Sequence, residues 1–74
     1  MEVKVGIRQV AKEIVVESDQ TADQLTEALR EALSSHGLLT LRDVHGRRVL
    51  VPSEGIGYVE LGAEHARPVG FGTI

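Results

Sequence analysis

The sequence predicts an α+β fold in which a single amphipathic helix packs on a mostly antiparallel sheet of five or six strands. Three observations support this prediction. Apolar residues alternate with polar residues in several short segments, one segment has the spacing of an amphipathic helix, and short connections join the segments. Short hairpin connections require antiparallel pairing, because parallel strands need a crossover of about a dozen residues or more. The expected order of elements is ββαβββ(β).

Residues 2–8 and 13–17 are the first two predicted strands. In the first, valine and isoleucine alternate with polar residues or glycine, which is the period of a strand with one buried face. The second is β-branched and bounded by glutamates, so we expect it to return along the first strand as a hairpin. Ile14 and Val16 would then share the buried face.

The helix is predicted over residues 22–35. Thr21 followed three residues later by Gln24 is the pattern of a capping box, in which each side chain accepts a hydrogen bond from an amide at the helix N-terminus. Apolar residues then recur at the three- and four-residue spacing of one helical face: Leu25, Ala28, Leu29, Ala32 and Leu33. We expect Gly37 to adopt the left-handed conformation that ends many helices.

A second hairpin is predicted after the helix, from residues 39–42 and 47–51. Asp43 and Gly46 occupy the first and last positions of the connection between these segments, which is the preference of a type I turn. Pro52 should end the second strand, because proline has no N–H to donate to a ladder.

The remaining residues are predicted to add a strand over 56–61, after a short loop at 53–55. Gly57 within this strand marks a bulge or a close approach of two backbones. A last short edge strand over residues 68–72 is weakly specified, because two of its residues are glycines. No repeat or interdomain linker interrupts the sequence, so residues 1–74 are expected to form one domain.

The composition limits the classes of protein to which the chain can belong. Only 3% of the residues are aromatic, so a large aromatic recognition surface is not expected. Without cysteine, neither a disulfide nor a thiolate zinc site can form, which favours a reducing compartment. There is no signal-peptide pattern, and no apolar run approaches the roughly 20 residues of a membrane span. We therefore expect a cytoplasmic protein that makes no use of a membrane.

Charge is unevenly distributed along the chain, although the net charge of −3 argues against nonspecific binding to nucleic acid or membranes. Basic residues gather at one end of the second hairpin: Arg42, His45, Arg47 and Arg48. The outer face of the helix is acidic, through Asp23, Glu27 and Glu31. The basic group could bind phosphate, a nucleotide or RNA, because the arginine fork matches phosphate oxygens, or it could be an ordinary solvated turn. Alternatively, the two charged surfaces attract a protein partner or a second copy of the chain.

Other residues that could carry chemistry do not form a recognisable site. The segments Gly55-Ile56-Gly57 and Gly70-Phe71-Gly72 lack the lysine and the following helix of a phosphate-binding loop. His36, His45 and His65 are predicted at a helix end, in a turn and in a polar segment, which is too scattered for a metal site. We expect no cofactor and no metal.

Catalysis is not indicated by any residue spacing. Ser53 beside Glu54, or His65 beside Glu64 and Arg67, could supply a nucleophile or a general base in principle. A domain this small has little room for the supporting residues that an active site needs. We therefore expect a protein that is not an enzyme, and a hydrolase or transferase that uses Ser53 or His65 is the least favoured alternative.

Several segments of the chain together resemble those of a known protein family: residues 1–7, 20–21, 37–41, 43 with 46–48, 58–62 and 69–72. They resemble a family of short actinobacterial proteins known as domain of unknown function 3107, over essentially the whole chain. Tyr58-Val59-Glu60 and Gly70-Phe71-Gly72 are the most specific parts of the resemblance. It implies a cytoplasmic bacterial protein without an established reaction. Some members have an ATP-binding label, for which this sequence offers no phosphate loop.

Two hypotheses about function follow from the sequence. The first is a non-enzymatic interaction module, an adaptor or regulator that binds a protein partner or itself through a sheet edge or the acidic helix face. The alternative is binding of a phosphate ligand such as ATP, or of nucleic acid, through Arg42, Arg47 and Arg48.

Overall fold

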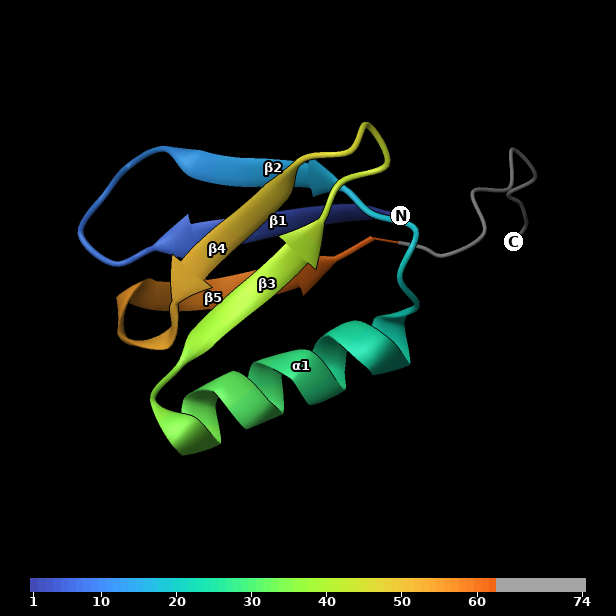
Figure 1. Cartoon of the computed structure of the whole chain (residues 1–74). Coiled ribbons are helices and arrows are strands. Elements are labelled where there is room, and N and C mark those ends of the chain that lie inside the picture. Colours follow the sequence, from blue (N-terminus) through green and yellow to red (C-terminus); the bar gives the residue numbers. More distant parts are fainter. Residues whose placement is uncertain (63–74) are drawn as a thin grey trace, which may run out of the picture.

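The computed structural model describes residues 1–62, and this part of the chain contains one α-helix and five strands (Figure 1). The elements are β1 (Glu2–Ile7), β2 (Glu13–Glu17), α1 (Ala22–Ser35), β3 (Leu38–Arg42), β4 (Arg48–Pro52) and β5 (Ile56–Leu61). A short 3-10 turn, η1 (Ser53–Gly55), joins β4 to β5. The predicted α+β class and the order ββαβββ are therefore confirmed. The predicted strand over residues 68–72 lies outside the described residues.

The five strands divide between two antiparallel sheets. The first has the order β2-β1-β5, and the second is the hairpin β3-β4. The end of β3 and the turn that follows it meet the end of β2 and the segment that follows β2 through two hydrogen bonds. The Val44 N–H donates to the Glu17 carbonyl (2.8 Å), and the Arg42 N–H donates to the Gln20 side-chain oxygen (3.2 Å). These contacts join the two sheets only at this point, and β3 does not pair with β2 as neighbouring strands of one sheet do.

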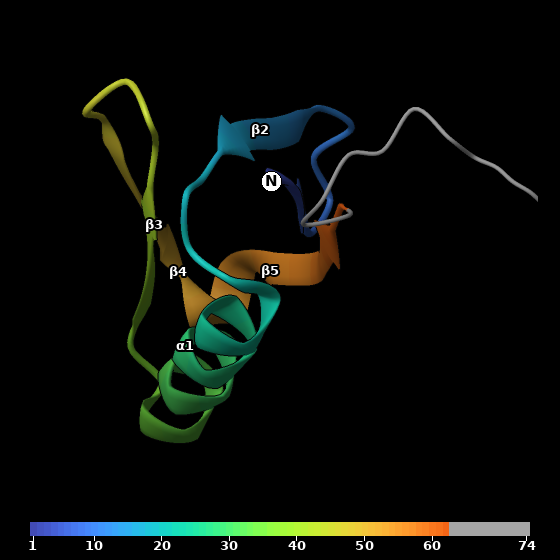
Figure 2. The same cartoon turned by 90° about the vertical axis from the view of Figure 1, so that its right-hand side faces the viewer.

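The hydrophobic core lies between the two sheets and α1. The hairpin β3-β4 crosses one face of the three-stranded sheet, and α1 closes the space between them along one side (Figure 2). The buried side chains come from all three parts: Val3, Val5, Val16, Leu25, Ala32, Leu39, Leu41 and Val51. Ile14 packs against this cluster beside Val16, as the alternation in the sequence predicts.

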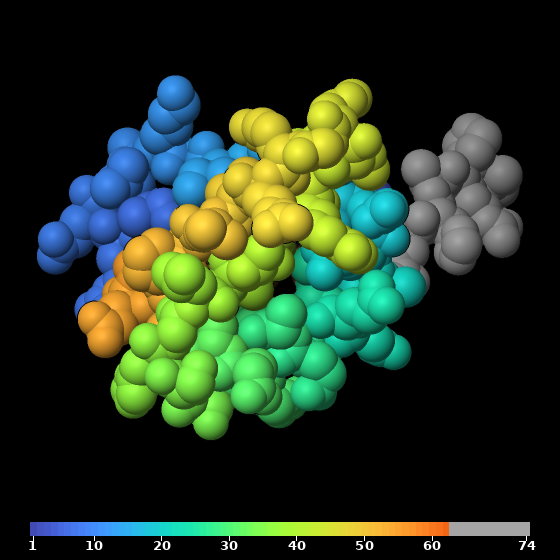
Figure 3. Space-filling model, in the orientation of Figure 1, coloured from blue at the N-terminus to red at the C-terminus, as the bar shows by residue number. Residues whose placement is uncertain are grey.

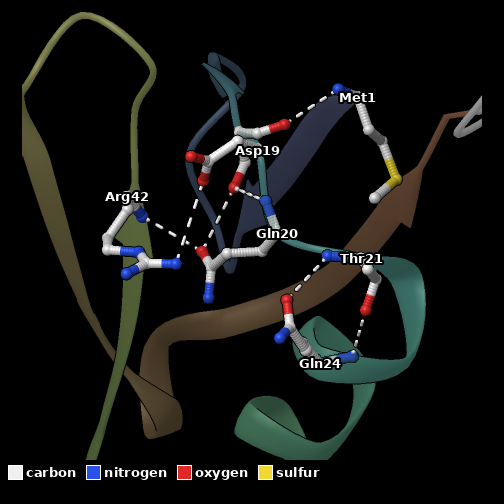
Figure 4. A network of polar contacts seen from close by, with 7 residues as sticks. Met1, Asp19, Gln20, Thr21, Gln24 and Arg42 are labelled. Atoms are coloured by element: carbon white, nitrogen blue, oxygen red, sulfur yellow. Dashed lines mark hydrogen bonds and ion pairs between the residues drawn. The ribbon is translucent and has the colours of Figure 1, made fainter.

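The capping box at the start of α1 is confirmed. Thr21 Oγ1 accepts a hydrogen bond from the Gln24 N–H (3.1 Å), and Gln24 Oε1 accepts one from the Thr21 N–H (2.9 Å), as Figure 4 shows. Thr21 itself is extended, so the chain turns into the helix at this residue. Two amides that have no partner within the helix are satisfied in this way.

The prediction for the helix C-terminus is wrong by one residue. The left-handed residue is His36, with φ of 55°, and not Gly37. The N–H groups of His36 and Gly37 both donate to the Ala32 carbonyl, which turns the chain one residue earlier than expected. Histidine is among the residues that adopt this conformation more readily than most.

The predicted apolar face of α1 also needs a correction at Leu33, whose side chain is 53% exposed. Each residue advances about 100° around a helix, so Leu33 lies about 100° from Ala32, which faces the core. Leu25 and Ala32 are buried, while Ala28 and Leu29 pack at the margin of the core. Leu33 therefore extends the apolar surface onto the flank of the helix.

The strand boundaries differ from the prediction by one residue in three places. β1 ends at Ile7 without Arg8, and β3 begins at Leu38. β4 covers residues 48–52 and not 47–51, because Arg47 belongs to the turn and Pro52 still pairs with Leu38. The turn itself is as predicted, since the Gly46 N–H donates to the Asp43 carbonyl (2.9 Å).

The predicted bulge at Gly57 is confirmed by the pairing of β1 with β5. Gly6 pairs with Tyr58, but the next residue, Ile7, pairs with Ile56, so Gly57 has no partner in the register. The Arg8 N–H then donates to the Gly55 carbonyl (2.8 Å) beyond the bulge. The bulge thus lets the chain pass from η1 into β5 while it stays in contact with β1.

Replacing Thr21 with alanine should lower the free energy of unfolding by about 0.5–2 kcal/mol, because the first turn of α1 loses its side-chain acceptor. Thr26→Ala is the matched control, since Thr26 is exposed and its hydroxyl only donates to the Ala22 carbonyl within the helix. The control should change stability by no more than about 0.5 kcal/mol. Urea unfolding followed by circular dichroism measures both changes. Equal losses in the two variants would contradict the role of the cap.

Candidate functional site

The basic residues of the second hairpin lie at its turn and on its outer face. Arg42 ends β3 and Arg48 begins β4, and the two residues pair directly across the hairpin. His45 and Arg47 belong to the turn between the strands. Arg42 and Arg48 are both exposed, so the structure brings two cations together on the same face. Like charges in this position repel each other.

Acidic side chains compensate two of the three arginines. Arg47 Nη2 lies 3.0 Å from Asp43 Oδ2, and Arg42 Nη2 lies 3.8 Å from Asp19 Oδ1. Within residues 1–62, Arg48 makes no side-chain hydrogen bond or ion pair. The hairpin end is therefore less basic than its sequence suggests, and Arg48 is the uncompensated member of the group.

Asp43 is the best-buried acid of the turn, with a side chain that is only 4% exposed. Its Oδ1 accepts a hydrogen bond from the His45 N–H (2.7 Å) and its Oδ2 one from Arg47 (3.0 Å). The hydrogen bond from the His45 backbone, followed by that from Arg47, lowers the pKa of Asp43, and partial burial opposes this effect. Asp43 thus stabilises the turn as a carboxylate and also holds Arg47 in place.

Stability should depend on pH through Asp43. Its folded-state pKa lies below the ordinary aspartate value of about 3.9, so the ionised carboxylate stabilises the fold above that value. This stabilisation is lost as the pH falls through the folded-state pKa. The melting temperature of the wild-type protein should therefore exceed that of Asp43→Asn at pH 7, and the difference should shrink below about pH 4. A difference that stays constant from pH 7 to pH 2 would contradict this role.

A polar network attaches the hairpin to the segment before α1 (Figure 4). Gln20 Oε1 accepts hydrogen bonds from the buried Ser18 hydroxyl (3.1 Å) and from the Arg42 N–H (3.2 Å). The Gln20 N–H in turn donates to the Ser18 hydroxyl (3.1 Å). This network fixes the backbone of Arg42, so the arginine projects from a rigid position.

The acidic residues of α1 are Asp23, Glu27 and Glu31, which recur every four residues and are all exposed. The helix itself lies away from the turn of the hairpin (Figure 1). Glu27 accepts a hydrogen bond from Arg30 at 3.3 Å, in a pair that is open to solvent on both sides. An exposed pair of this kind contributes little to stability. The face is therefore a weakly acidic surface with a single cation in it.

Two leucines on the hairpin lie at the surface, which the sequence patterns did not predict. Leu38 and Leu50 are each 55% exposed, and they lie on the face of β3-β4 that points away from the core. Leu50 pairs with Thr40 and Leu38 pairs with Pro52, so the leucines are diagonal neighbours on one surface. The sequence did contain a signal for this arrangement. In each strand the alternate positions that face the core are already apolar, so Leu38 and Leu50 occupy the positions that are normally polar.

We call this surface the hairpin outer face: Leu38, Thr40, Arg42, Arg48, Leu50 and Pro52. Its apolar members lie toward the base of the hairpin and its arginines toward the turn. In the space-filling view, β4 and β3 form a continuous ridge across the front of the molecule (Figure 3). Exposed apolar side chains bordered by polar residues mark many interaction sites, and arginine is enriched at protein interfaces.

The backbone of β4 is also open on one side. Among residues 1–62, β4 pairs with β3 alone. The Asp43 N–H donates to the Arg47 carbonyl, and the Ser53 N–H donates to the Gly37 carbonyl. These two bonds establish which residue pairs of the hairpin are hydrogen-bonded pairs. Because bonded and non-bonded pairs alternate in an antiparallel ladder, Arg48 and Leu50 direct their N–H and C=O groups away from β3.

Metal binding and catalysis receive no support from the described residues. No three histidine, aspartate or glutamate side chains within residues 1–62 lie close enough together to hold a metal ion. Ser53 is 5% exposed in η1, so its hydroxyl is poorly placed to act as a nucleophile. His65 and the segment Gly70-Phe71-Gly72 lie outside the described residues. In the part of the chain that the structure describes, no helix is long and apolar enough to cross a membrane.

These features define a small α+β domain with two antiparallel sheets, whose outer hairpin carries arginines and exposed leucines. The chain belongs to the family described as protein of unknown function (DUF3107), whose family model matches residues 1–72. The resemblance in the sequence is thereby confirmed. A comparison with curated proteins found no match.

Proposed function

We propose that this domain is a non-enzymatic interaction module, an adaptor or regulator that binds a protein partner or itself through the hairpin outer face and the open edge of β4. The observation that carries the proposal is the pair of exposed leucines, Leu38 and Leu50, beside that edge. An unpaired strand edge can accept an extended segment through backbone hydrogen bonds, while neighbouring side chains select its sequence.

The edge of β4 is better suited to this role than the edge of β2. Glu13 and Glu17 flank β2, and the Glu17 carbonyl already accepts the Val44 N–H. On β4, Pro52 removes one donor and Arg48 adds a charge, and both features discourage indiscriminate pairing. The uncompensated Arg48 favours a partner that presents an acidic residue next to an apolar one.

The acidic face of α1 is a second surface available to such a module. Asp23, Glu27 and Glu31 would attract a basic partner, and the effect would weaken with salt. Arg30 already compensates Glu27, and the acidic residues themselves offer no apolar anchor. The hairpin outer face is therefore the stronger candidate.

A photo-reactive amino acid at position 50 of the full-length protein tests the proposal in cells. Position 15 is the matched control, because Val15 is also an exposed apolar residue in the middle of an edge strand. We expect cross-linked products, identified by mass spectrometry, from position 50 and not from position 15. Light scattering during gel filtration shows whether the product is a second copy. The proposal fails if position 50 yields no product beyond those of position 15.

Anion binding at Arg42 and Arg48 is the second candidate. It is supported by the direct pairing of these two cations across the hairpin, since a bound phosphate group would relieve their repulsion. The pairing of Arg47 with Asp43 removes that arginine from the predicted set of three. Addition of ATP with magnesium, and then of a short RNA, should shift the amide signals of residues 42–48 and weaken with salt. Loss of the shifts in Arg48→Ala supports this site, and shifts scattered over the protein contradict it.

A cytoplasmic location in an actinobacterium is also part of the proposal. The absence of cysteine supports the reducing compartment, and the resemblance to the actinobacterial family supports the bacterial source. Fractionation of cells that express the full-length protein would test the location directly.

A further inference from the structure

α1 has a row of residues on its flank that is separate from the residues facing the core. Each residue advances about 100° around a helix, so the row lies about 60–120° to one side of Ala32, which faces the core. Its members recur at spacings of four, three and four residues, which is the spacing by which one helix packs along another. We call them the flank row: Ala22, Thr26, Leu29 and Leu33. Within residues 1–62 there is no second α-helix to contact this row.

The flank row borders a depression in the surface of the helix. The residues that line the depression are Thr26, Leu29, Arg30 and Leu33, which occupy positions i, i+3, i+4 and i+7. Four residues at these positions form the hole that receives one side chain from a facing helix in knobs-into-holes packing. Leu33 is 53% exposed, and Thr26 and Arg30 are also exposed, so the hole is open to solvent. The spacing of the row and the shape of the surface therefore favour the same occupant, another α-helix.

We infer that the flank row binds α1 of a second copy of this chain, in an antiparallel pair related by a two-fold axis. The inference does not rest on the function proposed for the hairpin outer face. In one antiparallel register, Thr26 lies opposite Leu29 of the second copy, and Ala22 lies opposite Leu33 of the second copy. The two-fold axis repeats both contacts, so all four residues of the row are covered. Thr26 of each copy then enters the depression of the other.

Two charged residues at the border of the flank row determine the partner and the direction. Asp23 and Arg30 lie seven residues apart, on the side of the row that faces away from the core. In the antiparallel register, Arg30 of each copy lies beside Asp23 of the other, so the ion pair forms twice. A parallel pair would instead bring Arg30 beside Leu25 of the second copy, where no charge compensates it. The row is therefore complementary to itself only in the antiparallel direction.

Both charged groups are available for these contacts. Asp23 is exposed, and its side chain forms no hydrogen bond or ion pair within residues 1–62. Arg30 lies 3.3 Å from Glu27 of its own helix, in a pair that leaves the arginine side chain 70% exposed. A guanidinium group has several N–H donors, so Arg30 can retain Glu27 while it binds Asp23 of the second copy.

Sedimentation equilibrium of the full-length protein tests the inference. The weight-average mass should rise from that of the monomer toward that of the dimer between about 10 μM and about 1 mM protein, because each copy contributes only one short helix to the contact. The mass should not exceed that of the dimer, since a two-fold contact is closed.

Leu33→Glu should raise the dissociation constant of the dimer at least about tenfold, because it places a charge in the apolar part of the row. Ser34→Glu is the matched control, since it adds the same side chain at the next residue, which is exposed and lies outside the row. The control should change the dissociation constant by no more than about twofold. Circular dichroism should show that both variants are folded, because both substituted residues are exposed.

An exchange of charges tests the antiparallel register. Asp23→Arg and Arg30→Asp should each weaken the dimer at least about tenfold, because two arginines or two aspartates then meet between the copies. When the two variants are mixed, they should form a heterodimer about as tight as the wild-type dimer, since each arginine again meets an aspartate.

Three results would overturn the inference. A protein that stays monomeric up to about 1 mM has no such contact. A dimer that tolerates Leu33→Glu uses another surface. Failure of the two charge variants to associate when mixed excludes the antiparallel register. None of these results bears on cross-linking of a different protein from position 50, so the inference and the proposed function can fail separately.

Discussion

Leu41→Ala is expected to lower the free energy of unfolding by about 2–5 kcal/mol, because the surrounding side chains only partly fill the cavity left by a truncated leucine. Leu41 is fully buried in the centre of β3, where it belongs to the core shared by both sheets and α1. In a domain this small the melting temperature should fall by at least about 8 °C.

Leu38→Ala is the matched control, because Leu38 lies on the same strand but points to solvent. It should change the free energy of unfolding by no more than about 0.5 kcal/mol. Thermal and urea unfolding of both variants measure the difference. Comparable losses in the two variants would mean that the outer face of the hairpin is as buried as the inner face, contrary to the fold of two sheets around one core.

The helix was predictable because its signals are local. The capping box depends on Thr21 and Gln24, which are three residues apart, and the apolar face depends on spacing within one segment. The capping box held in the structure, and so did the apolar face except at Leu33. How far around the helix the core extends is set by strands far away in the sequence, so the spacing within the helix does not predict that Leu33 is exposed. The error at His36 is local, because its N–H and that of Gly37 both donate to the Ala32 carbonyl.

The division into two sheets was not predictable from local patterns. It depends on contacts of the hairpin with the end of β2 and with the segment before α1, such as the hydrogen bonds from Val44 to Glu17 and from Arg42 to Gln20. Alternation in the sequence identifies which residues of a strand face inward, as it did for Leu39 and Leu41. It does not identify which strands share a ladder.

The candidate site was predicted in part. A short hairpin brings Arg42 and Arg48 together whatever the rest of the fold, so their proximity could be inferred from the turn residues. The compensation of Arg47 by Asp43 was missed, because Asp43 was interpreted only as a turn residue. The hairpin outer face was missed because leucine at an outward position resembles one more core residue until the register is known.

Tyr58 covers Gly6 on the solvent-facing side of the three-stranded sheet. Its hydroxyl donates a hydrogen bond to the Glu13 carboxylate, so the side chain spans all three strands from β5 to β2. That hydrogen bond, with a smaller contribution from desolvation, raises the pKa of Tyr58. A Cβ atom on Gly6 would overlap the Tyr58 ring.

Gly6→Ala should therefore lower the free energy of unfolding by about 1–3 kcal/mol, because the ring must leave its place and lose its bond to Glu13. Gly55→Ala is the control, since a Cβ there meets nothing within 4 Å, and it should be neutral or slightly stabilising. In a Tyr58→Ala background the penalty of Gly6→Ala should vanish, because the clash no longer exists. Urea unfolding of the four proteins in this cycle measures the coupling. A penalty of the same size with and without the tyrosine ring would show that Gly6 is required for its backbone alone.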